Sequence, residues 1–240
     1  MPYNDSVASR TGARAEVVNA FMRGVYMWMS LGLLVTGGVA WYVANTEAVL
    51  RLFFTPEGGV SMLFWGLVIG QLLMVVGLSA AISRMSGTMA TGLFMAYSAL
   101  NGITISFIFL AYTQASIVST FLICAGMFGA MSLYGLTTKK DLTSWGSFLF
   151  MGLIGVIIAS VVNIFLMSSM MHFIISVMGV IVFTGLTAYD TQQLRVMGET
   201  MPEDDATAVR RGTILGALRL YLDFINLFLM LLRLFGTGRE

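Results

Sequence analysis

Near its end, the sequence reads GTILGALRLYLDFINLFLMLLRLF over residues 212–235. A helix needs about 20 apolar residues to cross a hydrocarbon core of roughly 30 Å, so this run predicts a transmembrane span. Helical spacing places five side chains on one face of the span: Arg219, Asp223, Asn226, Met230 and Arg233. Asp223 would lie about 16 Å into the helix, near the bilayer midplane. Charge at that depth is costly unless it is paired or hydrated, which makes Asp223 the first candidate for function.

The composition of the whole chain describes a membrane protein. Hydrophobic residues make up 58% of the 240 residues and charged residues 10%, whereas a soluble domain carries roughly 25% charged residues. No stretch alternates apolar and polar residues as a barrel strand would. We therefore predict an all-α membrane protein whose residues 1–240 form a single integral membrane domain. Its seven transmembrane helices are expected at about residues 20–44, 61–83, 88–112, 115–137, 146–168, 171–194 and 212–235.

The last helix is expected at the centre of this seven-helix bundle. Its polar face needs neighbours that lipid does not offer. Small residues spaced four apart predict close contacts among the helices: Gly126 with Ala130, Gly155 with Ala159, and Gly212 with Gly216.

The same composition argues against a nucleic-acid partner and against cysteine-based sites. The net charge of +1, without a basic patch, argues against nucleic acid as a partner. The lone cysteine, Cys124, lies in an apolar run, so the chain has neither an intrachain disulfide nor a cysteine-based metal site. The partner that the composition does predict is the lipid bilayer.

Basic residues in the connections predict the orientation of the bundle, because cytoplasmic loops carry an excess of lysine and arginine. One side collects Arg10, Arg14, Arg23, Arg84, Lys139, Lys140, Arg195, Arg210 and Arg211. The other side has Arg51 and Arg239. We therefore expect the N-terminus in the cytoplasm and, after seven crossings, the C-terminus outside.

Two more charged residues fall at the inner ends of predicted spans. Asp190 follows Tyr189 near the inner end of the sixth span, and Arg84 ends the second span at a similar depth. The sixth helix runs inward and the seventh outward, so Asp190, Asp223 and Arg84 can converge in the inner half of the bundle. Simpler explanations stay open: Asp223 could merely pair with Arg219, four residues earlier, and Asp190 could be an interfacial carboxylate.

Several motifs resemble those of the Bax inhibitor-1 family, also called the transmembrane Bax inhibitor motif family. In the last span, LYLDFINLF at residues 220–228, followed by LLR at 231–233, is similar to the family's last-helix signature. Supporting matches are Tyr189-Asp190, Asn101-Gly102-Ile103-Thr104 and Lys139-Lys140-Asp141-Leu142. The resemblance extends over about residues 23–236, and the short N-terminus and compact loops look like the bacterial branch of the family.

The resemblance implies a pH-sensitive calcium leak channel in the bacterial inner membrane. It implies that Asp190 and Asp223 form the pH sensor and ion pathway, and that Arg84 is a latch engaging Asp190 in the closed form. The rest of the polar face would support this site: Arg219, Asn226 and Arg233. Calcium and protons are then the transported or sensed ions, with no tightly bound cofactor. Because Ca²⁺ takes six to eight oxygens, two aspartates with backbone carbonyls and waters offer only a weak transit site.

Two other functions are compatible with the same residues. An intramembrane aspartyl protease also places Tyr-Asp on one helix and Asp on the next, and two carboxylates sharing a proton suit hydrolysis. Its expected Gly-x-Gly-Asp context is missing, since Leu220-Tyr221-Leu222 precedes Asp223, and we therefore expect no enzyme. The other alternative is a non-transporting regulator of membrane proteases or channels, whose protein partners the sequence does not identify.

Overall fold

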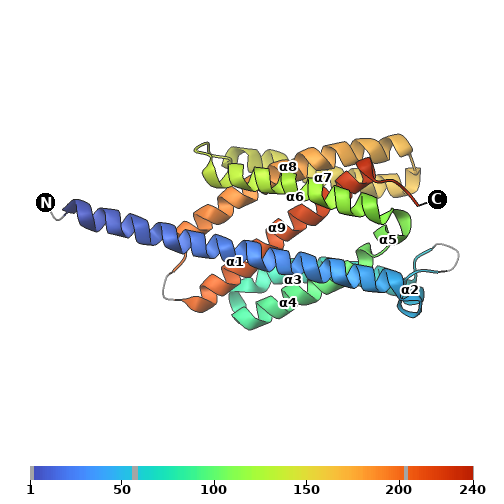
Figure 1. The fold of residues 1–240 in the computed structure, drawn as a ribbon, viewed down its shortest axis with the longest axis horizontal. Helices are drawn as coiled ribbons and strands as arrows, with labels where there is room; N and C mark the ends of the chain where they lie inside the picture. Colours follow the sequence, from blue (N-terminus) through green and yellow to red (C-terminus); the bar gives the residue numbers. More distant parts are fainter. Residues whose placement is uncertain (1–2, 56–58, 203–204, 240) are drawn as a thin grey trace. The chain divides into compact units, whose positions relative to one another are not determined.

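The computed structural model describes residues 3–55, 59–202 and 205–239, with side chains from residue 14 onward. Every regular element in these ranges is a helix, which confirms the all-α prediction (Figure 1). The elements are α1 (Tyr3–Asn45), α2 (Glu47–Phe53), α3 (Met62–Ala81), the 3-10 turn η1 (Ile82–Arg84), α4 (Gly87–Ile105), α5 (Ile108–Ala111), α6 (Gln114–Thr137), α7 (Thr143–Leu166), α8 (Ser169–Thr200) and α9 (Ala206–Phe235).

Seven of the described helical segments are long and apolar enough to cross a membrane, as the sequence predicted. They are Arg14–Asn45, Met62–Arg84, Gly87–Ala111, Gln114–Thr137, Thr143–Leu166, Ser169–Thr200 and Ala206–Phe235. The chain is therefore a multi-pass membrane protein.

Three of the predicted helices were too short at one end, where the sequence becomes polar. The helix α1 begins at Tyr3 rather than near residue 20, α8 continues to Thr200, and α9 begins at Ala206. A search for apolar runs ends where polar residues begin, although polar residues continue a helix readily in water. The acidic break predicted around residues 201–205 includes residues 203–204, which lie outside the described residues. Its described start agrees, since α8 ends just before Pro202, where proline disfavours a further helical turn.

Two interruptions were not expected. The connection after α1 holds the short helix α2, in which Arg51 forms a salt bridge with Glu47 one turn earlier. The third span is broken between α4 and α5, where Ser106 Oγ donates a hydrogen bond to the carbonyl oxygen of Ile103 (2.7 Å). Neither position carries a proline or glycine that would mark a local change in backbone direction.

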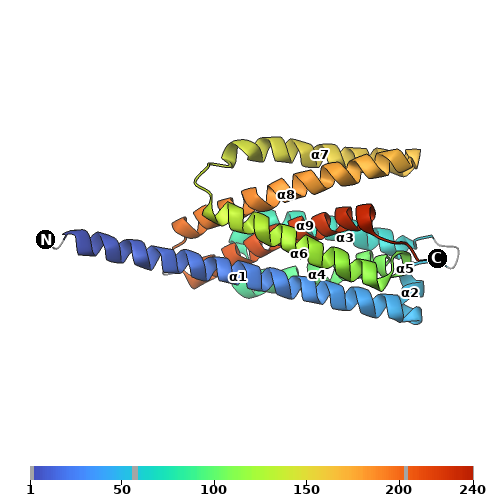
Figure 2. The ribbon, with the colours of Figure 1, turned by 45° about the horizontal axis from the view of Figure 1, so that its top comes forward.

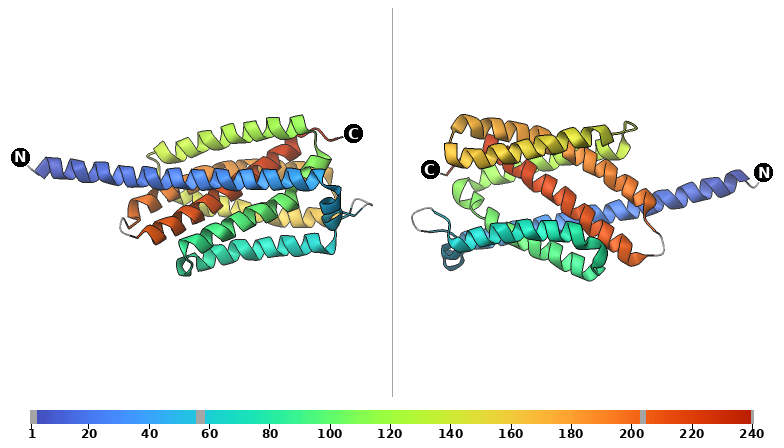
Figure 3. Two further views of the ribbon diagram at one scale, coloured as in Figure 1. Left: turned by 60° about the horizontal axis from the view of Figure 1, so that its bottom comes forward. Right: turned by 180° about the vertical axis from the view of Figure 1, so that it is seen from behind.

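Two compact units make up the chain, and unit 1 comprises Met1–Leu110 with Val196–Leu218. In it, α4 lies beside both α1 and α3 (Figure 3). Thr36 Oγ1 of α1 donates a hydrogen bond to the carbonyl oxygen of Ser98 of α4 (2.8 Å). Gln71 of α3 donates to the hydroxyl of Thr104 of α4 (3.1 Å). Polar side chains at membrane depth thus find partners on neighbouring helices.

Unit 2 comprises Ala111–Arg195 with Arg219–Glu240. Figures 2 and 3 show α7 running beside α8, where Gly152 of α7 faces Val182 of α8. The helix α6 also packs closely on α8. A Cβ added to Gly135 of α6 would lie 2.4 Å from the carbonyl oxygen of Ala188, so only glycine permits this approach.

Residues 237–239 pair with residues 111–113 at the start of unit 2, in antiparallel fashion. The N–H of Thr113 donates to the carbonyl oxygen of Thr237 (3.1 Å). The N–H of Thr237 donates in turn to Ser116 Oγ (2.9 Å). The segment after the last span is thereby tied to the connection that precedes α6.

The helix α9 contributes to both units, since residues 206–218 belong to unit 1 and the remainder to unit 2. In unit 1, Arg210 Nε donates to the hydroxyl of Thr91 on α4 (3.1 Å). In unit 2, the ring of Phe224 packs edge-on against Phe128 of α6 with centroids 5.4 Å apart. Of the seven spans α9 is the most buried: 72% of its most apolar stretch is buried, against 11–50% for the other six. This high burial is what the predicted need of its polar face for protein neighbours requires.

The glycines predicted to make close helix contacts divide into two groups. No described atom lies within 4 Å of a Cβ built on Gly126 or Gly155, apart from their own local helix, so the prediction was wrong for these two. A Cβ built on Gly212 of α9 would lie within 4 Å of the side chains of Met201 and of Phe21 in α1, so this glycine does make a close contact. A small-residue pattern shows where backbones are able to approach, but not which face a neighbour covers. Gly135, described above, approaches the backbone of a neighbouring helix, and so does Gly102, whose added Cβ would lie 2.6 Å from the carbonyl oxygen of Thr36.

We expect Gly135→Ala to lower the thermal unfolding temperature of the detergent-solubilised protein. The new methyl group would meet a backbone carbonyl, which cannot rotate away, and overpacking of this kind costs about 1–3 kcal/mol. Gly129→Ala on the same helix is the matched control, because its Cβ meets nothing within 4 Å. There the greater helix propensity of alanine should leave the unfolding temperature unchanged or raised. Equal unfolding temperatures for the two variants would contradict the α6–α8 contact.

The orientation of the bundle remains a prediction, and cysteine labelling checks it. We expect single cysteines at positions 10 and 239 to react with a membrane-impermeant maleimide from opposite sides. The native Cys124 is fully buried and gives little background. The side chain at position 10 lies outside those that the structure describes. Labelling of both positions from the same side would rule out an odd number of crossings.

Candidate functional site

Unit 2 brings together the two aspartates that the sequence singled out. Asp223 of α9 is 5% exposed, and Asp190 of α8 is partly buried. Their carboxyl groups lie within hydrogen-bonding reach of each other. One oxygen of Asp223, Oδ2, is buried and has no hydrogen-bond partner among the described residues. A pair of facing carboxyl groups with a free buried oxygen is able to take up a proton or a cation.

Hydrogen bonds at the end of α8 hold Asp190 in place. Gln192 accepts a hydrogen bond from the N–H of Leu142 (2.8 Å) and donates one to the carbonyl oxygen of Lys140 (2.8 Å). Arg195 donates to the carbonyl oxygen of Leu136 at the end of α6 (2.7 Å). These bonds fix α8 against the connection between α6 and α7, and with it the register of Asp190.

Aromatic packing against α6 holds Asp223 at its depth. The ring of Phe224, the next residue along α9, contacts the rings of Phe121 and Phe128 with centroid separations of 5.4 Å each. The thiol of Cys124, on the same side of α6, lies 3.7 Å from the carbonyl oxygen of Phe224. Cys124 is thus a small packed residue beside the site rather than a ligand.

Arg219, one turn before Asp223, lies close enough for its charge to act on both aspartates. Its side chain is nevertheless exposed, and the described residues include no salt bridge between Arg219 and Asp223. The long aliphatic stem of arginine lets the guanidinium reach water while its backbone remains in the helix. A simple structural pairing with Arg219 therefore does not account for the burial of Asp223.

The rest of the predicted polar face divides into separate environments. Asn226 is partly buried and donates a hydrogen bond to the carbonyl oxygen of Leu222 in its own helix (2.8 Å). Arg233, in the last turn of α9, is exposed. Met230 is buried against Gly179 of α8. The supporting role of Asn226 and Arg233 therefore stays a prediction.

Arg84 is the last residue of η1, in unit 1, and its side chain is exposed. The neighbouring carbonyl oxygen of Ser83 accepts a hydrogen bond from Arg211 of α9 (2.8 Å), which anchors the turn. The aspartate pair belongs to unit 2, and the latch between Arg84 and Asp190 stays a prediction.

The residues described contain no cluster of three or more histidine, cysteine, aspartate or glutamate side chains able to hold a metal ion. The two aspartates supply carboxylate oxygens to a cation, but far fewer than the six to eight that Ca²⁺ takes. Backbone carbonyls and water would have to complete its coordination.

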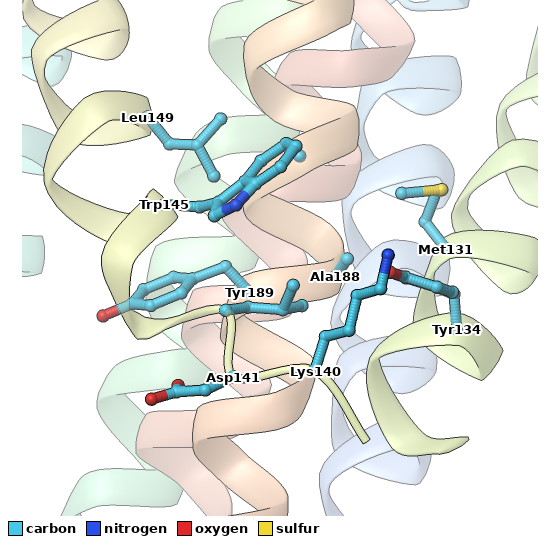
Figure 4. A pocket seen from close by; sticks show the side chains of 10 residues that line it. Met131, Tyr134, Lys140, Asp141, Trp145, Leu149, Ala188 and Tyr189 are labelled. Atoms are coloured by element: carbon cyan, nitrogen blue, oxygen red, sulfur yellow. The ribbon is translucent and has the colours of Figure 1, made fainter. Parts of the chain in front are cut away.

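Sequence reasoning missed a cavity of about 260 Å³ in unit 2, where α6 ends and α7 begins (Figure 4). Its lining comes from α6, the connection to α7, and the facing helices: Met131, Tyr134, Lys140, Asp141, Leu142, Trp145, Leu149, Gly185, Ala188 and Tyr189. The available signal was the grouping of two charged residues with tryptophan and tyrosine at the ends of spans. The sequence alone does not show that these side chains enclose a space.

Comparison with known proteins agrees with this fold. A family model described as inhibitor of apoptosis-promoting Bax1 matches residues 18–240. The inner membrane protein YbhL of Escherichia coli (strain K12) is 53% identical over 239 residues, covering 99% of this chain and 98% of that protein. An uncharacterised protein of Borreliella burgdorferi is 46% identical and covers 93% of this chain and 94% of its own length. An uncharacterised protein of Caulobacter vibrioides is 42% identical, with 92% and 89% covered.

Proposed function

Since this chain belongs to the Bax inhibitor-1 family, we propose that it is a calcium leak channel that opens as the pH falls. The proposed sensor is the pair Asp190 and Asp223, and the proposed activity is ion conduction, not catalysis. The Escherichia coli relative is named as an inner membrane protein, and we place this chain in a bacterial inner membrane as well, with its N-terminus in the cytoplasm.

The observation that carries the proposal is the approach of the two carboxyl groups in a buried position. Two ionised carboxylates are both acceptors and repel each other, whereas one shared proton allows a hydrogen bond between them. The number of protons on the pair therefore changes the force between α8 and α9. A group that changes charge inside a helix bundle is suited to bias two arrangements of the helices.

In this proposal, protonation of Asp190 opens the channel by weakening its attraction to Arg84. At higher pH, the shared proton resides on Asp223, and an ionised Asp190 attracts the permanently charged Arg84. Acidification neutralises Asp190 and removes this attraction, which favours the open arrangement. We therefore expect calcium flux through the channel to increase as the pH falls.

The chemistry of the same site supports calcium as the proposed transported ion. Carboxylate oxygens suit this hard divalent cation, and a site with few ligands binds it weakly. Weak binding favours conduction, because an ion must leave the site as readily as it enters.

Calcium flux into liposomes containing the purified protein, measured between pH 6 and pH 8, tests the proposal. We expect protein-dependent flux that rises by roughly tenfold toward pH 6, the change that a proton-linked bias of about 1.4 kcal/mol produces. Liposomes without protein supply the baseline at each pH. Flux at the baseline throughout this range would refute a channel and favour the non-transporting regulator.

A further inference from the structure

The cavity between α6, α7 and α8 has charged groups at its rim and an apolar interior. Lys140 and Asp141 come from the connection between the two spans, and both side chains are exposed. Leu142 and Leu149 are buried on the inner side. Trp145, at the start of α7, remains 60% exposed although it lines the cavity. Its amphipathic lining distinguishes this space from an ordinary packing void.

The polar groups of the cavity lie on two opposite sides (Figure 4). On one side, the side chain of Lys140 extends toward Tyr134 of α6. On the other side lie the carboxylate of Asp141 and the hydroxyl of Tyr189. Trp145 and Leu149 of α7 lie above the space that separates these groups in this view. A positive and a negative group therefore lie on opposite sides of the same cavity lining.

Hydrogen bonds and close packing hold the lining of this cavity in place. The amide side chain of Gln192 binds the backbone of both Lys140 and Leu142 (2.8 Å each). Tyr189 lies flat against α7 because position 146 is glycine: an added Cβ would come within 2.5–2.8 Å of the tyrosine ring and hydroxyl. The loop and the ring are therefore held in place before any ligand arrives.

Asp141 keeps its negative charge over the whole physiological range. The side chain of Thr143 and its backbone N–H, which lies 2.9 Å from Asp141 Oδ1, donate hydrogen bonds to this carboxylate and lower the pKa of Asp141 below its ordinary value of 3.8. Lys140 supplies a basic side chain on the opposite side of the cavity. The cavity is therefore lined by one basic and one acidic side chain.

The cavity lies at the level where lipid headgroups meet water. The α6 span ends at Thr137 and the α7 span begins at Thr143, so the connection between them emerges from the bilayer. Tryptophan, tyrosine and lysine are the side chains that favour this interfacial region. A ligand reaching this cavity from the bilayer has a polar head and apolar chains.

We propose that this cavity binds the headgroup of one phospholipid that carries both a phosphate and a primary ammonium group. The phosphate lies at Lys140 and Tyr134, and the ammonium donates hydrogen bonds to Asp141 and Tyr189. Trp145 and Leu149 cover the glycerol region, and the acyl chains remain in the bilayer.

The charge pattern separates this headgroup from other common ones. A headgroup with phosphate but no cation leaves its negative charge beside Asp141, which repels it. A choline headgroup brings a cation without N–H donors, so it cannot form the hydrogen bonds that Asp141 and Tyr189 accept. A primary-amine headgroup satisfies both sides of the cavity at once.

Native mass spectrometry of the purified, full-length protein tests the proposal, with equimolar phosphatidylethanolamine, phosphatidylcholine and phosphatidylglycerol in the detergent solution. We expect one phosphatidylethanolamine molecule to remain bound in preference to the other two lipids. Lys140→Met removes the ammonium while keeping a similar apolar stem, and it should weaken retention by about fivefold, the effect of losing one exposed charge pair.

Lys139→Met is the matched control, because Lys139 is the adjacent residue of the same connection but does not line the cavity. It should retain phosphatidylethanolamine like the wild type. Retention should also be the same at pH 5.5 and pH 7.5, since the pKa of Asp141 lies below this range. Equal retention of all three lipids, equal retention by the two methionine variants, or retention of free glycerophosphoethanolamine as strongly as of the lipid would each overturn the proposal. The lipid readout does not depend on calcium flux, so it stands or falls separately from the proposed channel.

Discussion

Asp223→Asn and Asp190→Asn proteins are each expected to lose most of the pH response of calcium flux between pH 6 and pH 8. Asparagine has nearly the shape of aspartate but never ionises in this range, so the pair can no longer change its charge with pH. A flux ratio of roughly tenfold in the wild type should fall to nearly one. The absolute flux of Asp190→Asn should resemble that of the acid-opened wild type, because neutral Asp190 no longer attracts Arg84.

Asp205→Asn is a matched control for the same chemical change outside the site. Asp205 precedes α9 and accepts a hydrogen bond from the N–H of Ala208 (2.9 Å), a capping role that asparagine fills equally well. Its flux should follow pH like the wild type. The thermal unfolding temperature of each variant confirms that it remains folded. Wild-type flux in both site variants at every pH would exclude Asp190 and Asp223 as the sensor.

Arg84→Ala should leak calcium at pH 7.5–8, where the wild type is mostly closed. Without the guanidinium, ionised Asp190 loses the partner that holds the inner end of the bundle shut. Loss of an interaction of about 1.4 kcal/mol or more raises the open population by roughly tenfold or more. Flux measured at pH 8 in proteoliposomes gives the result directly, and at pH 6 the variant and the wild type should converge.

Two further variants separate a latch from a general disturbance of η1. Arg51→Ala removes an exposed arginine that is paired only with Glu47 in α2, and it should leave flux unchanged. The double variant Arg84→Ala with Asp190→Asn should leak no more than Asp190→Asn alone, because the two changes remove one interaction. Additive effects, or an Arg84→Ala protein as tight as the wild type at pH 8, would rule out the latch.

The number and type of the spans could be predicted from the sequence because lipid leaves a backbone few choices. An apolar run of about 20 residues that crosses a membrane must satisfy its own hydrogen bonds, and a helix does so. The extensions of α1 and α8 lie beyond the apolar runs, where water no longer imposes this rule and the pattern gives no boundary. At the break, both the backbone N–H and the hydroxyl of Ser106 donate hydrogen bonds to the carbonyl oxygen of Ile103, and no proline or glycine at residues 103–111 marks the position.

The aspartates of the candidate site could be predicted from the free-energy cost of placing a charge inside a span. The cavity could not be predicted, because it depends on how the helices pack. Asp223 stood out because a carboxylate in the middle of a span is expensive to bury without a role. Its approach to Asp190 followed from the opposite directions of consecutive helices. The cavity at Trp145 has no such signal, since tryptophan and lysine at the end of a span are common interfacial residues. The contact at Gly135 depends on which helix covers which face, and this is decided by packing among distant segments.

The pairing of residues 237–239 with 111–113 also sets an order of events during synthesis. Ser116 and Thr237, which share a hydrogen bond, are 121 residues apart in the chain. A ribosome delivers the connection before α6 to the membrane well before it has made residues 237–239, which pair with that connection. The backbone groups of residues 111–113, before the fourth span, therefore lack these hydrogen-bond partners until the seventh span has been inserted. A reporter protein fused directly after residue 239 would hinder the pairing of residues 237–239 with residues 111–113. A chain that ends at residue 235 could not form this pairing.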